Sequence, residues 1–219
     1  MDELYKGYVI TKNKKSIEKI QGVKEFKKLE DVQDCEEYAG VLADDVIVID
    51  IDDMQQSEIL MKIVEDLQLN CRVYVTKRGR HFVFKNSGVK SCGTGKRLAC
   101  GLDADIKVGG KNTYEVIKIE GKDRFIEWEA EGEYDALPKW LYPIKCNVDF
   151  FNMEEGDGRN STLYSYILTL NNYGFTKQES RQCIELINKF VLSEPLSEKE
   201  LDVILRDEAF PEDGTHGRR

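Results

Sequence analysis

Residues 46–53, Val-Ile-Val-Ile-Asp-Ile-Asp-Asp, decide the fold, because four aliphatic residues run directly into closely spaced carboxylates. In a β-strand, side chains two residues apart point to the same face, so Asp50 and Asp52 project together while Val48 and Ile49 anchor the strand in the core. Neighbouring carboxylates repel each other unless a cation lies between them, and Mg²⁺ or Mn²⁺ takes such hard oxygen ligands. The stretch therefore predicts a buried strand that ends in a metal site. The alternative is a strand end that reaches solvent, where turn-forming Asp is common.

The composition is that of an ordinary folded protein. The chain has 219 residues, of which 41% are hydrophobic and 33% charged, with only four prolines. These values indicate one domain or two small ones, without a disordered or low-complexity tract. The apolar runs are far shorter than a bilayer span, and the N-terminal Met-Asp-Glu is acidic with no apolar segment behind it. We therefore expect no membrane span, no signal peptide and a cytoplasmic location.

The six cysteines are scattered without a C-x-x-C pair, which argues against a zinc ribbon and against a disulfide framework. Free thiols are the expected state. Cys92 and Cys100 bracket a loop and form an alternative zinc site with His81, although the sequence offers no evident fourth ligand.

The charge is unevenly distributed along the chain. A net charge of −9 argues at first against a nucleic-acid partner, because phosphate binding depends on Lys and Arg. Residues 72–111, however, contain ten basic side chains and two acidic ones. A basic island that follows an acidic strand end suits a site that holds both a metal and a polyphosphate. The alternative is a solvated loop with incidental lysines.

Hydrophobic periodicity places the other elements of the first two thirds of the chain. Asn70 is expected to close the helix after the acidic strand, and two hairpins follow, one around a basic turn and one around Gly109-Gly110. The expected elements are one or two short helices at 16–30, strands at 46–52, 71–76, 81–84, 102–108 and 113–118, a helix at 57–68 and a connection at 87–101. This order predicts an α+β fold with a mixed, largely antiparallel sheet.

After about residue 145 the pattern becomes helical. Residues 161–172 carry apolar side chains on one helical face, and Gly174 suits a helix C-terminus. Thr176 and Ser197 each stand three residues before a Glu, which is the spacing of a capping box. Three short helices are expected, with residues 150–158 as the linker that precedes them.

Three segments of the first part combine into one pattern: VIVIDID (46–52), TKRGRHFVF (76–84) and DADIKVGG (103–110). Hydrophobic-Asp-hydrophobic-Asp, then Gly-x-His, then Asp-x-Lys resembles the archaeo-eukaryotic primase superfamily, specifically its phage and plasmid primase-polymerase branch. GRNSTLYSYILTLNNYGFTKQES (158–180) and PLSEKELDVIL (195–205) resemble the small helical domain that follows the catalytic domain in many phage primases. The two similarities together cover most of the chain.

The resemblance implies roles for the matching residues. Asp50, Asp52 and Asp105 would be the catalytic ligands of two Mg²⁺ or Mn²⁺ ions. Arg78, Gly79, Arg80, His81 and Lys107 would bind the nucleotide triphosphate, with Gly79 allowing the backbone to approach the phosphates. Two departures accompany this assignment: Asp103 is an alternative to Asp105 as third ligand, and Arg80 stands where the family often has a small residue. A buried core role is the alternative for His81.

The resemblance also implies the architecture and the partners. Residues 1–148 would form the primase-polymerase catalytic domain, with an RRM-like core, and residues 149–219 the helical C-terminal domain. Such an enzyme makes or extends primers in phage or plasmid replication inside a bacterial host cell, from NTPs or dNTPs on a single-stranded DNA template. A replicative helicase, as a further domain or a subunit, is an additional implied partner.

Two other functions fit parts of the sequence. In a phosphatase of the haloacid dehalogenase type, Asp50 would attack phosphorus and Asp52 would act as acid and base. That class expects a parallel sheet, and Thr or Val where this chain has Met54. A catalytically silent nucleic-acid-binding replication module is the second alternative. Tyr74, Phe82 and Tyr114 are candidates for stacking on bases, although we expect them to pack in the core of the sheet.

Overall fold

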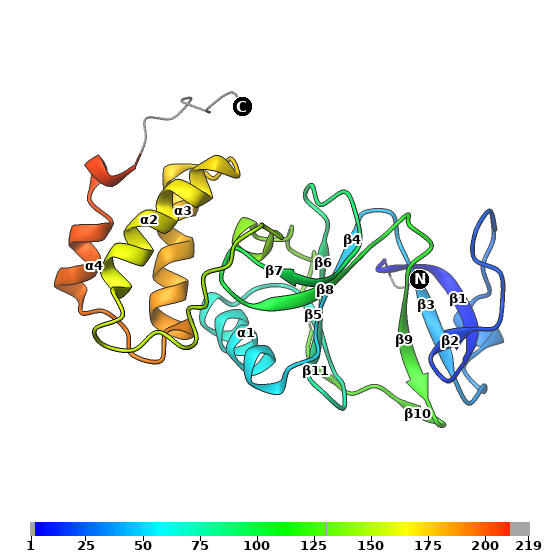
Figure 1. Cartoon of the computed structure of the whole chain (residues 1–219). Helices are drawn as coiled ribbons and strands as arrows, with labels where there is room; N and C mark the ends of the chain where they lie inside the picture. The colour runs from blue at the N-terminus through cyan, green and yellow to red at the C-terminus, as the bar shows by residue number, and fades with distance from the viewer. Residues whose placement is uncertain (1–2, 130, 211–219) are drawn as a thin grey trace. The chain divides into compact units, whose positions relative to one another are not determined.

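The computed structural model describes residues 3–129 and 131–210. It divides into two compact units, which we call the sheet unit and the helical unit (Figure 1). The sheet unit comprises Met1–Glu58, Gln68–Gly95 and Ala104–Leu137, and the helical unit Ile59–Leu67, Lys96–Asp103 and Pro138–Arg219. The predicted domain boundary between residues 148 and 149 stays a prediction. No helix among the described residues combines the length and the apolar character needed to cross a bilayer.

The acidic strand lies at the centre of a six-stranded sheet, with the order β11-β5-β6-β4-β8-β7. β4 pairs antiparallel with β6 on one side and with β8 on the other. Its four leading aliphatic residues are fully buried, as the apolar run predicts. The strands are β4 (Val46–Ile51), β5 (Arg72–Val75), β6 (Arg80–Lys85), β7 (Gly93–Arg97), β8 (Asp103–Val108) and β11 (Ile126–Trp128). The prediction of an α+β fold with antiparallel pairing is confirmed.

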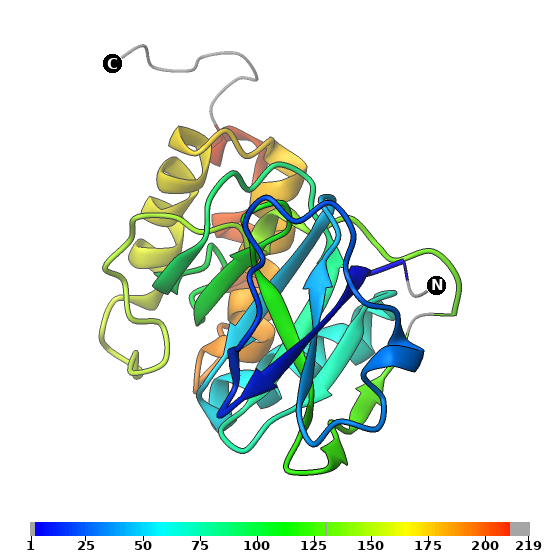
Figure 2. The same ribbon diagram turned by 90° about the vertical axis from the view of Figure 1, so that its right-hand side faces the viewer.

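A second sheet, with the order β10-β9-β3-β1-β2, packs against one face of the first. Val46 and Val48 share a buried cluster with Tyr5, Tyr8 and other side chains of the second sheet. In Figure 2 the dark blue strand β1 passes in front of the strands of the six-stranded sheet. The strands of this second sheet are β1 (Tyr5–Lys12), β2 (Lys15–Ser16), β3 (Tyr38–Leu42), β9 (Tyr114–Ile119) and β10 (Lys122–Asp123).

The expected helix after β4 is present as α1 (Met54–Leu67). It begins three residues earlier than the periodicity indicates, because the Asp53 carboxylate accepts a hydrogen bond from the Gln56 backbone N–H at 2.8 Å and caps the first turn. The helix ends at Leu67, and Gln68 takes the left-handed conformation with φ 51°. The expectation that Asn70 closes the helix is therefore wrong by two residues.

The helical unit contains the predicted helices. α2 (Arg159–Asn172), α3 (Lys177–Leu186) and α4 (Glu198–Ile204) are joined by short turns, and the π-helical segment η3 (Ile187–Val191) extends α3. Both capping boxes form, at Thr176 with Glu179 and at Ser197 with Glu200. Gly174 has φ 75°, as a helix C-terminus requires. The remaining short helices are η1 (Leu29–Asp31), η2 (Lys139–Leu141) and η4 (Asp207–Ala209).

Three further expectations about the elements are wrong, the first being the connection at 87–101, which contains strand β7 (Gly93–Arg97). Residues 16–30 form no α-helix; this segment instead donates and accepts backbone hydrogen bonds along β1, including Tyr8 N–H to Lys27 O at 2.8 Å. The second hairpin is also wrong, because β8 lies in the six-stranded sheet and β9 in the other. At Gly109 the chain runs so close to the β3–β4 turn that an added Cβ would lie 1.7 Å from Ala43 O. From there it crosses to β3, which pairs with β9.

Candidate functional site

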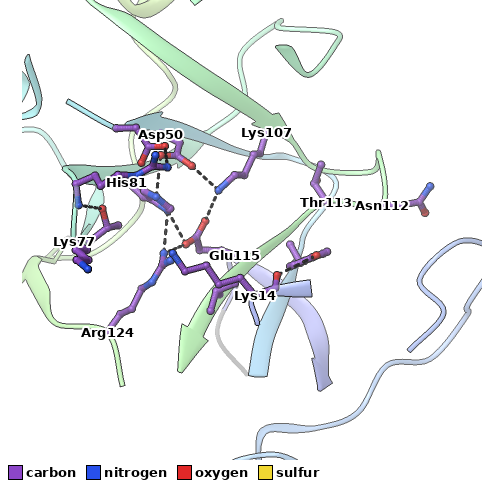
Figure 3. A pocket seen from close by; sticks show the side chains of 14 residues that line it. Lys14, Asp50, Lys77, His81, Lys107, Asn112, Thr113, Glu115 and Arg124 are labelled. Carbon is purple, nitrogen blue, oxygen red and sulfur yellow. Dashed lines mark hydrogen bonds and ion pairs between the residues drawn. The ribbon is translucent and has the colours of Figure 1, made fainter. Parts of the chain in front are cut away.

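A pocket of about 420 Å³ lies in the sheet unit, between the end of β4 and strand β9 of the second sheet (Figure 3). Three carboxylates line it, those of Asp50, Asp52 and Glu115. Five Lys and Arg side chains also line it: Lys14, Lys77, Arg78, Lys107 and Arg124. The cations outnumber the carboxylates, so the pocket suits an anionic ligand better than a cationic one.

Asp50, Asp52 and His81 form the one group in the described residues with three or more potential metal-ligand side chains whose donor atoms lie within 4.8 Å of one another. The strand register brings them together. Asp50 lies directly opposite His81 across the β4–β6 pair, so both side chains project to the same face. Asp52 follows two residues later and returns to that face. The structure therefore assembles three of the residues that the sequence singles out.

Asp50 is buried and held by two cationic groups. Its Oδ1 lies 2.9 Å from His81 Nε2, and its Oδ2 lies 2.8 Å from Lys107 Nζ. Burial raises the pKa of Asp50, but the His81 and Lys107 groups lower it more, so this carboxyl stays ionised well below its ordinary range. Oδ1 is at ion-pair distance from His81 without hydrogen-bond geometry, which leaves this buried oxygen without a hydrogen-bond donor among the described residues.

Glu115 lies beneath the surface of the pocket and contacts three of its cationic side chains. This fully buried carboxylate accepts from His81 Nδ1 at 2.7 Å and from Lys107 Nζ at 3.2 Å, and it also pairs with Arg124. Figure 3 shows the three cationic side chains converging on it. Sequence reasoning missed both Glu115 and Arg124. The available signal was that Glu115 stands two residues from Ile117 in one strand, which places an acid on a face that packs between the sheets.

The protonation states follow from these contacts. Burial lowers the pKa of His81, but the charge of Glu115 and the close contacts with the Asp50 and Glu115 carboxylates raise it more. Both ring nitrogens face carboxylates, so the imidazole is protonated: Nδ1–H donates to Glu115 Oε1, and Nε2–H lies at ion-pair distance from Asp50 Oδ1. Burial raises the pKa of Glu115, but His81, Lys107 and Arg124 lower it to about 2. For His81 to ligate a metal, the ion must displace the Nε2 proton, whereas the Asp50 carboxylate is already a deprotonated ligand.

The basic turn between β5 and β6 sends its side chains in two directions. Arg78 is exposed, lines the pocket and pairs with Asp52. Arg80 lies on the opposite face of the sheet, where it donates to Ser57 Oγ at 3.2 Å and pairs with Glu127 at 2.5 Å. The structure therefore does not bring Arg80 to the site. An added Cβ at Gly79 would lie 1.9 Å from Ile51 O, so this glycine allows the turn to pack against the end of β4.

The two candidate third ligands differ in position. Asp105 lies opposite Asp50 across the β4–β8 pair, on the same face, but its Oδ1 accepts from Gly95 N–H at 2.7 Å. It is outside the group formed by Asp50, Asp52 and His81. Asp103 is held by Arg97 through two contacts of 2.7 and 3.0 Å. Register therefore favours Asp105 over Asp103 as the neighbour of Asp50.

The remaining candidates occupy other environments. Cys100 is buried, and burial raises the pKa of its thiol to about 12, which disfavours the thiolate that zinc requires. No cysteine belongs to a potential metal group within the described ranges. Tyr74 and Phe82 are buried in the sheet, whereas Tyr114 lines the pocket.

No protein-family model matches the chain, and no curated protein matches it. The function is therefore inferred from the motifs and from the geometry of the pocket.

Proposed function

We propose that the protein is a DNA primase-polymerase, a template-directed nucleotidyltransferase that joins NTPs or dNTPs on single-stranded DNA. One observation carries the proposal: the carboxylates Asp50 and Asp52 lie at a strand end inside a pocket that is otherwise rich in Lys and Arg. Nucleotidyl transfer needs both parts, because a divalent cation must meet a triphosphate there.

The side chains present fit one divalent cation. The buried Asp50 Oδ1, which has no hydrogen-bond donor among the described residues, and a carboxylate oxygen of Asp52 would be its ligands. Oxygen ligands of this kind suit Mg²⁺ or Mn²⁺, and His81 is a further potential donor. When bound, the ion would polarise a phosphoryl oxygen or lower the pKa of the attacking hydroxyl. A second ion held with the help of Asp105 belongs to the same proposal.

The cationic side chains of the pocket would bind the triphosphate. Lys107 and His81 face it from β8 and β6, and Arg78 reaches it from the β5–β6 turn. Lys14 and Lys77 also line it. These groups would orient the α-phosphate for attack and stabilise the charge that develops on the leaving pyrophosphate.

The helical unit would contribute to the same reaction by holding the template or the initiating nucleotide, and a replicative helicase would be the partner of the whole protein. A phosphatase of the haloacid dehalogenase type fits the fold less well. That class needs its nucleophile on a strand of a parallel sheet, whereas β4 pairs antiparallel with both of its neighbours. A binding module without catalysis is an outcome that the experiment below detects.

De novo primer synthesis tests the proposal. The chain is incubated with single-stranded DNA, labelled nucleotides and Mn²⁺ or Mg²⁺, beside the double variant Asp50→Ala/Asp52→Ala. Asp45→Ala is a matched control, because Asp45 directly precedes the first residue of β4 and pairs with Lys85 away from the pocket. We expect products from the unmodified chain and from the control, and none from the double variant. If the chain makes no product but hydrolyses a generic phosphatase substrate, the result supports a phosphatase. If it binds DNA but shows neither activity, the result supports a binding module.

A further inference from the structure

Glu115 has an unusual environment for an acidic residue in a strand. Its side chain is 0% exposed, and three cationic groups contact its two oxygens. Oε1 meets His81 Nδ1 at 2.7 Å and the Arg124 guanidinium, whereas Oε2 meets Lys107 Nζ at 3.2 Å. One carboxylate thus fixes side chains that come from β6, from β8 and from the segment after β10.

A structural ion pair would not need this arrangement. One cation neutralises a buried carboxylate, and each further cation has to be desolvated as well. Here Asp50 and Glu115 together face three cations, His81, Lys107 and Arg124, so the cluster carries a net positive charge next to the pocket. All three cations also line the pocket (Figure 3). The buried carboxylate is therefore placed to hold three donors on one wall.

We propose that Glu115 is a positioning residue, which holds His81, Lys107 and Arg124 in the geometry that binds the polyphosphate of the nucleotide. The inference rests on the proposed function and adds two residues to the site. Arg124 is the donor that lies outside the three sequence motifs, and Glu115 acts through its neighbours without touching the substrate. Preorganised donors bind an anion more tightly than mobile ones, because the side-chain entropy is lost on folding rather than on binding.

The direction in which Glu115→Gln changes the affinity for an anion distinguishes positioning from simple electrostatics. The variant Glu115→Gln makes the pocket more positive by one charge, so charge alone predicts tighter binding of an anion. Positioning predicts the opposite, because the amide cannot accept from three cations and these side chains lose their fixed geometry. Glu127→Gln is a matched control: Glu127 pairs with the buried Arg80 on the opposite face, outside the pocket.

The test uses inorganic tripolyphosphate in the presence of a chelator, with isothermal titration calorimetry of the full chain. We expect Glu115→Gln and Arg124→Ala each to weaken binding by about tenfold, and the double variant to bind about as weakly as either one, because residues in one network are not additive. Glu127→Gln is expected to bind as the unmodified chain does. Unchanged or tighter binding by Glu115→Gln would overturn the inference, and so would fully additive losses.

Primer extension gives a second and separable readout. Loss of positioning raises the KM for the nucleotide, whereas partial unfolding only lowers the amount of active enzyme and leaves KM unchanged. We expect a raised KM for Glu115→Gln and an unchanged KM for Glu127→Gln. If the unmodified chain makes no DNA product but tripolyphosphate binding falls in Glu115→Gln, the polymerase proposal fails and the assignment of Glu115 as organiser of an anion site stands. If polymerisation is present and KM is unchanged in Glu115→Gln, the role of Glu115 fails alone.

Discussion

At the scale of single residues, the site depends on how buried charges are compensated. Asp50 and Glu115 lie on either side of the His81 ring, and Lys107 bridges the same two carboxylates. Each acid is ionised because its cations outweigh the cost of burial. The network therefore links the strand-end carboxylate that would hold a metal to the wall that would bind the phosphates.

Glu115 makes the free energy of unfolding depend on pH in the acidic range. Its folded pKa of about 2 lies below the ordinary value of 4.5, so its contribution to folding is complete above 4.5 and is lost as the pH falls toward 2. Glu115→Gln leaves His81, Lys107 and Arg124 without their shared partner and should cost about 3 kcal/mol near neutral pH. Urea denaturation of both proteins checks this: the difference in unfolding free energy should shrink as the pH falls below 4.5. A difference that is constant with pH would contradict the assignment.

At the scale of elements, the local patterns predicted much and the long-range pairings little. The apolar run of β4, the helical spacing in α1 and the capping boxes of α3 and α4 are local signals, and each element formed. The local patterns indicate neither β1 nor β3, and they pair β9 with the wrong strand. Those strands are specified by contacts with segments distant in sequence, such as β3 with β9.

The residues of the candidate site likewise fall into those that local motifs predict and those that only long-range packing brings in. Asp50, Asp52 and His81 stand in recognisable motifs, and the sheet brings them together. The prediction for Arg80 is wrong, because this residue precedes His81 by one position and strand alternation sends it to the other face. Glu115 and Arg124 reach the site from the second sheet and from the segment after β10. Only the packing of the two sheets reveals that contribution.

The turn between β1 and β2 allows a test at this scale. Thr11–Ser16 and Lys12–Lys15 are paired, and the two residues between them, Asn13 and Lys14, have φ values of 51° and 65°. Positive φ at both positions is typical of a tight hairpin turn in which Gly is preferred at the second one. Lys14→Gly should therefore raise the free energy of unfolding by about 0.5–1 kcal/mol.

Chemical denaturation measures that gain, and Lys15→Gly is the control. Lys15 lies in β2, where glycine weakens a strand, so that variant should lose stability. A loss of stability in Lys14→Gly would show that the side chain of Lys14 contributes more to folding than its backbone conformation costs.

At the scale of the whole molecule, the compact units do not follow the sequence as two consecutive blocks. Residues 96–103 belong to the helical unit, where Ala99 O accepts from Tyr166 Oη at 2.7 Å and from Cys183 Sγ at 3.3 Å. Phe150 is fully buried and packs edge-on against Tyr166 at a centroid distance of 5.0 Å. The predicted linker at 150–158 thus begins with a core residue of that unit.

A chain that ends at residue 148 should therefore be less stable than the complete protein. The truncation removes Tyr166, Cys183 and Phe150, and so exposes the segment 96–103 that they cover. Differential scanning calorimetry should show a Tm lower by about 5 °C or more, and limited proteolysis should cut within 96–103. An unchanged Tm would mean that the first 148 residues fold independently, as the resemblance to primase-polymerases implies.

The extension of an annealed DNA primer by one labelled nucleotide in Mn²⁺ tests the proposed polymerase activity and its metal site in one experiment. The unmodified chain is compared with Asp50→Asn/Asp52→Asn, which keeps the size of both side chains and removes the charge that a cation requires. We expect template-dependent incorporation by the unmodified chain and its complete loss in the variant, with the variant still folded by circular dichroism. Incorporation that persists in the folded variant, or that is absent from the unmodified chain, would contradict this expectation.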